Sequence, residues 1–225
     1  MTALSELSKN AAGSNMFLNE SRKEYTKYDF DKSRALDNPF QQFSEWFEFA
    51  EKNAVFEPNA MHISTVDETG APKNRVVLLK SFNHDGFVFF SNYNSAKGKE
   101  IKRNPNVALT FFWPNIERQV RVEGSAQHTS KEVSDAYFKT RPRDSQLSAW
   151  ASDQSEKVSD RAELDRRLDL FKNKFPTNVP RPDHWGGFEV KPHRFEFWQG
   201  RENRYHDRII YEKKSNDWHI FRISP

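Results

Sequence analysis

The spacing of apolar residues changes along the chain, and each change marks an expected structural element. Between residues 39 and 54 the apolar side chains recur at helical spacing and form one broad face. This face contains Phe40, Phe43, Trp46, Phe47 and Ala50. Asn38 is a favourable N-cap residue, and Pro39 suits the first helical position. The pattern predicts an amphipathic helix that packs against a sheet.

From residue 60 onwards the apolar spacing has a period of two, which is typical of half-buried strands. Turn signals at residues 67–70 and 83–86 indicate antiparallel hairpins. Five strands are expected, at residues 60–66, 72–82, 87–92, 106–113 and 117–128, with a short helix at 96–103. Because these strands would otherwise leave hydrophobic edges exposed, we expect them to form a barrel.

Two helices and further strands are expected after residue 128. A capping box from Thr129 to Glu132 predicts the first helix, and Pro142 predicts its end near Arg141. A second capping pattern at 160–163 predicts a helix that reaches about residue 175, followed by a proline-containing loop. Strands are then expected at 187–192, 194–200, 208–214 and 218–224.

The chain is expected to consist of one domain with a tail. Residues 1–20 are rich in Ser, Asn, Ala and Glu and show little periodicity, which predicts a mobile segment. Residues 21–225 are expected to form a single domain. Aromatic residues make up 14% of the 225 residues, and 20 of them are phenylalanine, so the core should be aromatic-rich.

Composition excludes several classes of protein. The chain has no cysteine, which excludes disulfides, zinc fingers and iron–sulfur clusters, and we expect no metal site. It has neither a secretory signal nor an 18-residue apolar run, so we expect a cytoplasmic protein without a membrane partner. A net charge of +3 permits anionic ligands but falls short of the dense basic stripe of a nucleic-acid-binding protein.

Residues 137–155 contain the first candidate site. Tyr137 and Arg141 are four residues apart and share a helical face, and Ser145 follows just past the helix break. A tyrosine hydroxyl, a guanidinium and a serine hydroxyl could converge on one phosphate. The alternative is that the arginines pair with Asp144 and with surface carboxylates.

Other candidate groups lie on the expected strands and the short helix. Arg75 and Lys80 are the cationic ends of an aliphatic strand, although such cations usually just reach solvent. Lys97 lies at the start of the short helix, where backbone N–H groups favour anions. The amides of Gln119 and Gln154, the latter beside Ser155, could contact the polar edge of a heterocycle.

Residues 196–208 contain the densest group of candidates. Arg204, His206 and Arg208 alternate, so they would project to one face if a strand began there, an arrangement that favours a bound anion. Trp198 precedes them on an aromatic strand. The alternative is a solvent-exposed face on which Asp207 and Glu202 screen the cations.

Five segments in order carry a resemblance to a known family. They are RVVLLK at 75–80, ERQV at 117–120, residues 137–155, HWGGF at 184–188 and EFWQGRENRYHDR at 196–208. Over roughly residues 20–225 the chain resembles the pyridoxine (pyridoxamine) 5′-phosphate oxidases of the FMN-binding split-barrel family. The resemblance implies a mainly β, α+β fold with peripheral helices around an antiparallel split β-barrel.

The resemblance also implies an activity and an assembly. The expected enzyme uses FMN and oxygen to oxidise pyridoxine 5′-phosphate or pyridoxamine 5′-phosphate to pyridoxal 5′-phosphate. Hydrogen peroxide is released, with ammonia from the amine, in the last step of vitamin B6 cofactor synthesis and salvage. The expected assembly is a homodimer with two FMN sites between the subunits, each lined by both chains.

Residue roles follow from the same resemblance. FMN contacts would be Arg75, Val76, Val77, Leu78, Leu79, Lys80, Phe90, Ser91, Lys97, Gln119, Gln154, Ser155, Trp198 and Arg208. Substrate contacts would be Lys80, Tyr137, Arg141 and Ser145 at the phosphate, Arg204, Tyr205 and His206 at the pyridine ring, and Arg22 and Tyr25 in an amino-terminal flap. Arg204 and His206 would be the catalytic residues, orienting the substrate carbon and assisting proton removal.

Three positions and one segment depart from the family pattern. The segment is residues 28–30, where the family commonly has a glycine-rich stretch after the flap tyrosine. Ala96 stands where an arginine is frequent, which removes a cation that Lys99 could replace. Phe90 stands in place of a frequent tyrosine, and Tyr205 in place of an aliphatic residue. The other functions considered are a split-barrel flavin reductase or a heme or F420 handler, a non-catalytic vitamer-binding protein, and an aromatic-lined nucleic-acid barrel.

Overall fold

The structure is a computed structural model that describes residues 24–225. The predicted tail at residues 1–20 and the predicted flap residue Arg22 lie outside the described part. Among the described residues, no helix is both long enough and apolar enough to cross a membrane.

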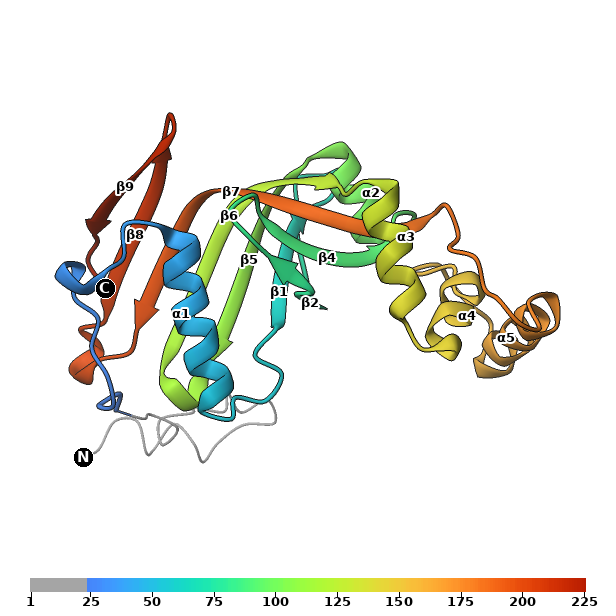
Figure 1. Cartoon of the computed structure of the whole chain (residues 1–225), viewed down its shortest axis with the longest axis horizontal. Helices are drawn as coiled ribbons and strands as arrows, with labels where there is room; N and C mark the ends of the chain where they lie inside the picture. Colours follow the sequence, from blue (N-terminus) through green and yellow to red (C-terminus); the bar gives the residue numbers. More distant parts are fainter. Residues whose placement is uncertain (1–23) are drawn as a thin grey trace, which may run out of the picture.

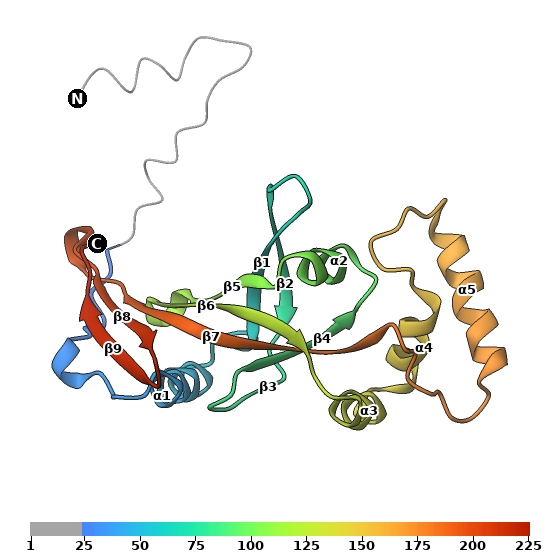
Figure 2. The ribbon, with the colours of Figure 1, turned by 90° about the horizontal axis from the view of Figure 1, so that it is seen from above.

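Within residues 24–225, one curled antiparallel sheet of nine strands forms the body of the structure (Figures 1 and 2). The strands are β1 (Ala60–Val66), β2 (Pro72–Leu78), β3 (Ser81–Phe82), β4 (Phe87–Asn92), β5 (Asn106–Trp113), β6 (Arg118–His128), β7 (Trp185–Gln199), β8 (Asp207–Lys214) and β9 (Asp217–Arg222). Their order is β2-β1-β5-β6-β7-β4-β3, with β8 on β7 and β9 on β8. The predicted antiparallel split-barrel class is confirmed.

Strand β7 joins the parts of the sheet because it changes partners along its length. Residues 185–190 pair with β4, residues 188–199 pair with β6, and residues 194–199 also pair with β8. The prediction of two strands here was wrong. Glu123 pairs with Arg194 and Gly124 with Pro192, which leaves one residue of β7 unpaired between them. This irregularity accommodates a proline, which has no N–H to donate.

The predicted strand at 72–82 is also divided. Strand β2 ends at Leu78. The next two backbone N–H groups bond outside β1: that of Leu79 donates to the Asn59 carbonyl, and that of Lys80 donates to the Val88 carbonyl of β4. The described chain therefore has six strands before residue 129, where the sequence predicted five. Leu79 is buried in the core.

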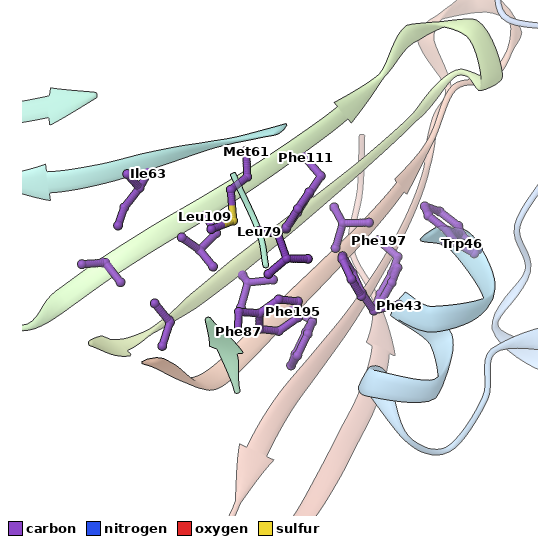
Figure 3. Close-up of a cluster of buried hydrophobic side chains, with 14 of the residues drawn as sticks. Phe43, Trp46, Met61, Ile63, Leu79, Phe87, Leu109, Phe111, Phe195 and Phe197 are labelled. Atoms are coloured by element: carbon purple, nitrogen blue, oxygen red, sulfur yellow. The ribbon is translucent and has the colours of Figure 1, made fainter. Parts of the chain in front are cut away.

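Helix α1 (Pro39–Lys52) covers one face of the sheet, as its pattern predicted (Figure 1). The Asn38 side chain caps it by accepting from the Phe40 N–H at 2.8 Å. Figure 3 shows Phe43 and Trp46 of this helix beside Phe87, Phe111 and Phe197 of the sheet. The ring centroids of Phe43 lie 4.9 Å from Phe87 and 5.0 Å from Phe111, so the core is aromatic.

In the described part of the chain, four further α-helices lie displaced from α1 along the long axis of the molecule, toward the end away from β8 and β9 (Figures 1 and 2). They are α2 (Ala96–Arg103), α3 (Lys131–Thr140), α4 (Arg143–Ala151) and α5 (Arg161–Lys174). Helix α3 ends before Pro142 as predicted, but its cap is Ser130, which accepts from the Val133 N–H, rather than Thr129. The sequence did not predict α4, whose N-cap position is Pro142 and lacks a side-chain cap.

Candidate functional site

An open cleft of about 790 Å³ is bounded by strands β2 and β4, the start of α2, the junction of α3 and α4, and residues 154–155. Its lining includes the predicted residues Arg75, Val76, Val77, Leu78, Lys80, Phe90, Ser91, Lys97, Tyr137, Arg141, Ser145, Gln154 and Ser155. Segments far apart in the sequence thus meet around one space. Most of the predicted FMN contacts and the four predicted substrate-phosphate contacts face the same cleft.

Lys97 is a buried cation in the lining of this cleft. Ser95 caps α2, and the lysine Nζ donates to Ser91 Oγ at 3.0 Å and to Gln154 Oε1 at 3.3 Å. Burial lowers the pKa of Lys97; the charge of Arg75 lowers it further and that of Glu100 raises it. Within residues 24–225 no carboxylate forms an ion pair with Lys97. An ammonium group with only neutral partners favours a bound anion.

Arg141 supplies a second, half-buried cation. The helix break at Pro142 leaves Arg141 extended at the end of α3, and its guanidinium lies 4.3 Å from the ring centre of Trp185. Its buried Nη1 has no hydrogen-bond partner among the described residues. Burial lowers the pKa of Arg141, although the nearby Tyr137 raises it. A half-buried guanidinium with an unmet, buried donor is suited to an anionic ligand.

Aromatic rings position the residues around Arg141. Phe90 and Tyr137 stack with centroids 3.8 Å apart and planes inclined by 15°. Trp185 lies parallel to Phe90, with centroids 5.7 Å apart. A phenylalanine at position 90 therefore keeps the ring contact that holds Tyr137, although it lacks a hydroxyl group.

Two cations near the cleft are already paired with carboxylates. Arg75 forms an ion pair with Glu100 at 2.8 Å and also donates to Thr65. Lys99 pairs with Glu156 at 2.7 Å and lies outside the cleft lining. The expectation that Lys99 could replace the cation missing at Ala96 is therefore not supported by its position.

A second group of predicted residues lies around the far end of β7. The Trp198 ring is 4.7 Å from His206 and 5.7 Å from Tyr25, measured between ring centroids. Gln119 and Arg208 are the neighbours of Trp198 on β6 and β8. The buried carboxylate of Glu196 fixes Arg208 through contacts of 2.7 and 2.8 Å.

The predicted alternation of Arg204, His206 and Arg208 on one strand face was wrong. Glu202–Arg204 form a short 3-10 turn, and β8 begins only at Asp207. Asn203 and Arg204 have φ values of 54° and 60°, which turn the chain before the strand begins. Arg204 and Tyr205 are exposed, whereas His206 is half-buried.

The two groups are separated by the length of β7. Trp185 lines the cleft and Trp198 lies in the second group, thirteen residues further along the strand, which corresponds to on the order of 40 Å. The cleft lining contains none of Gln119, Trp198, Arg204, His206 and Arg208. A single chain thus divides the predicted site residues between two places.

Sequence reasoning missed one residue of the cleft that contacts Arg141. Trp185 stacks against the guanidinium and lies parallel to Tyr137 at a centroid distance of 6.2 Å. Its signal was the HWGGF segment, to which no role was given. Two neighbouring glycines in that segment are required by close packing, since a Cβ on Gly186 would lie 2.0 Å from the Tyr93 hydroxyl.

Comparisons with known proteins agree with the resemblance seen in the sequence. The profile of the family described as pyridoxamine 5′-phosphate oxidase matches residues 47–174. The chain belongs to this family. A second profile, described as the pyridoxine 5′-phosphate oxidase C-terminal dimerisation region, matches residues 185–225.

Relatives in the oxidase family align over most of the chain. A pyridoxine/pyridoxamine 5′-phosphate oxidase of Rubrobacter xylanophilus is 52% identical over 205 residues, covering 91% of this chain and 94% of the relative. One of Haemophilus influenzae is 52% identical over 210 residues, covering 93% of this chain and all of the relative (100%).

Solved structures share the fold. PhzG from Burkholderia lata, in complex with tetrahydrophenazine-1-carboxylic acid, superposes with a TM-score of 0.84 at 25% identity and covers 89% of this chain and 100% of its own. An FMN-binding protein related to pyridoxamine 5′-phosphate oxidase from Nostoc punctiforme gives a TM-score of 0.67 at 17% identity, over 85% of this chain and 100% of its own.

Proposed function

We propose that this protein is an FMN-dependent oxidase of pyridoxine 5′-phosphate and pyridoxamine 5′-phosphate. Pyridoxine 5′-phosphate and oxygen would give pyridoxal 5′-phosphate and hydrogen peroxide. Pyridoxamine 5′-phosphate would also consume water and release ammonia. Membership of the pyridoxamine 5′-phosphate oxidase family and the relatives at 52% identity support this activity.

The observation that carries the proposal is a pair of cations in one cleft, the buried Lys97 and the half-buried Arg141. Lys97 and Arg141 each lack a carboxylate partner within the described part of the chain. FMN and the substrate each bring one phosphate, so two anionic groups would meet two uncompensated cations. The chemistry of the cleft therefore fits both molecules.

The cofactor would be held by Lys97, Ser91, Gln154 and Ser155, together with the backbone of β2. When bound, FMN supplies the two-electron oxidation that no protein side chain can provide. Arg141, Tyr137 and Ser145 would bind the substrate phosphate. Their task is to position the reacting carbon, because the remote phosphate gives binding energy that orients the substrate.

The proposed assembly is a homodimer in which each site uses both groups of residues. Tyr25, Trp198, Arg204 and His206 would come from one subunit and the cleft from its partner. The match of residues 185–225 to a dimerisation region supports this arrangement. The separation of the two groups along β7 supports it independently.

An absorbance spectrum tests the cofactor and the substrate together. The purified protein should show a flavin band, which should bleach when pyridoxamine 5′-phosphate is added without oxygen. Admission of air should restore the band and release hydrogen peroxide. Unphosphorylated pyridoxamine is the matched control, and it should bleach the band far less at the same concentration.

Two results would contradict the proposal. Failure to retain flavin after soaking with FMN would remove the cofactor and favour a vitamer-binding protein. A flavin that is reduced by a nicotinamide nucleotide but not by either phosphorylated vitamer would favour a flavin reductase.

A further inference from the structure

The ring of His206 is held by a hydrogen bond that determines which nitrogen carries its proton. The backbone N–H of Arg201 donates to His206 Nδ1 at 3.0 Å. A backbone amide can only donate, so Nδ1 must present a lone pair. In the neutral ring the proton therefore lies on Nε2.

The loop that supplies this donor is fixed on both sides. The Gly200 N–H donates to the Glu117 carbonyl at 2.8 Å, and the Tyr205 N–H donates to the Glu202 carbonyl at 3.0 Å. The guanidinium of Arg201 contacts Asp207 at 3.2 Å. The backbone donor is thus part of an ordered turn rather than a chance contact.

Aromatic neighbours fix the plane of the same ring. Trp198 lies 4.7 Å away and Tyr25 5.8 Å away, measured between ring centroids. A Cβ on Gly200 would lie 2.7 Å from the Tyr25 ring, so the loop and the ring are closely packed. A rotation of the imidazole that exchanged its two nitrogens would have to break the Nδ1 bond and disturb this packing.

The surroundings also oppose a charged imidazolium. Burial lowers the pKa of His206; the charges of Arg204 and Arg208 lower it further, whereas Asp207 raises it. A proton on Nδ1 would in addition face the N–H of Arg201. Both effects favour the neutral ring near pH 7.

We propose that His206 acts as a neutral Nε2–H hydrogen-bond donor to a lone-pair atom of the substrate, and not as the base that removes a proton. This inference rests on the oxidase function proposed above. The proton lost from the substrate hydroxyl or amino group would then go to water. The expectation that His206 assists proton removal is replaced by a role in orienting the substrate.

Nitrogen NMR of the resting protein tests the tautomer without any assay of oxidation. In protein labelled with ¹⁵N in its histidine rings, the His206→Gln variant identifies the His206 signals among the 7 histidines of the chain. We expect a protonated Nε2 and an unprotonated Nδ1 at pH 7. A protonated Nδ1, alone or in the imidazolium, would overturn the inference.

Two substitutions with side chains of different length test whether His206 acts as a hydrogen-bond donor. The side-chain amide of His206→Gln can place an N–H near the position of Nε2, whereas that of His206→Asn reaches only the position of Nδ1. We expect kcat to fall less than about tenfold in the glutamine variant, because its N–H can replace the donor. It should fall about a hundredfold in the asparagine variant, because the substrate atom then has no donor. Loss of a proton-transfer group would instead cost about 10²–10⁴-fold in both variants.

The pH profile separates a donor from a base. The glutamine variant should keep the acid limb of the wild-type kcat profile. If that limb disappears and the glutamine variant is as slow as His206→Ala, His206 is a base and the inference fails. Flavin content measured in each variant controls for misfolding. Absence of oxidation in the unmodified protein would instead contradict the proposed function, whatever the NMR result.

Discussion

Arg141 and Arg143 are two residues apart and have contrasting surroundings. Arg143 donates to the carbonyl groups of Phe175 and Thr177, whereas Arg141 stacks on Trp185 and keeps a buried donor without a partner. Arg143 therefore stabilises a loop, whereas Arg141 is suited to binding a ligand. Either reading was open from the sequence, because residue types do not reveal which donors are already satisfied.

The substitution Arg141→Met should therefore weaken substrate binding selectively. We expect KM for pyridoxamine 5′-phosphate to rise roughly 10- to 100-fold, because hydrogen bonds to charged groups contribute about 1.5–3 kcal/mol. Steady-state kinetics measures the change, with Arg143→Met as the matched control. An equal rise in KM for both variants would argue against a phosphate contact at Arg141.

Lys97 and Lys99 form a second matched pair. Lys97 is buried with neutral partners, whereas Lys99 is exposed and paired with Glu156. We expect Lys97→Met to weaken FMN binding at least about tenfold, since it removes a charge-assisted contact from a buried site. The Lys99→Met variant should bind FMN with the same affinity as the wild-type protein. Titration of the apoprotein by flavin fluorescence quenching would show whether the two variants differ.

At the scale of helices and strands, the sequence predicted those elements whose bounds are set by neighbouring residues in the chain. The bounds of β1, β4, β5 and α2 match the predictions because apolar period, turn residues and caps agree there. The continuity of β7 could not be predicted, since Pro192 breaks a strand pattern unless the strand has an irregularity there, which in β7 is the unpaired His193. Helix α4 lacks a capping side chain, so its start gave no signal.

The packing of α1 against the sheet should contribute strongly to the free energy of unfolding of the protein. Phe43 is fully buried among aromatic rings, and its replacement in Phe43→Ala should lower the free energy of unfolding by about 3–5 kcal/mol through lost burial and a cavity. Urea denaturation measures this change. Phe56 is 87% exposed, so Phe56→Ala is the matched control and should change the value by less than about 0.5 kcal/mol.

At the scale of the whole molecule, the division of the site between two places predicts complementation. One set of chains would carry Arg141→Met in the cleft, and the other His206→Ala in the loop. A mixed dimer would then contain one site with both changes and one site with neither. The sequence alone could not show this division, because it depends on the path of β7.

Mixing the two defective proteins should restore activity. After unfolding and joint refolding, random pairing should give roughly a quarter of the wild-type rate, measured well below the wild-type KM. Each protein refolded alone is the control. If activity stays at the level of the separate proteins, each site is built within one chain and the proposed shared site is wrong.

The position of β7 in the chain also has a consequence for biosynthesis. Strand β4 pairs only with β3 and β7, so the β3–β4 hairpin cannot join the rest of the sheet before β7 exists. Residues 185–199 are synthesised only after β4 and β6 are complete. Until then β4 and β6 each present an unpaired edge to other nascent chains. A ribosome that stalls before residue 185 would therefore release a chain whose sheet is open, and such fragments should depend on chaperones to stay unaggregated.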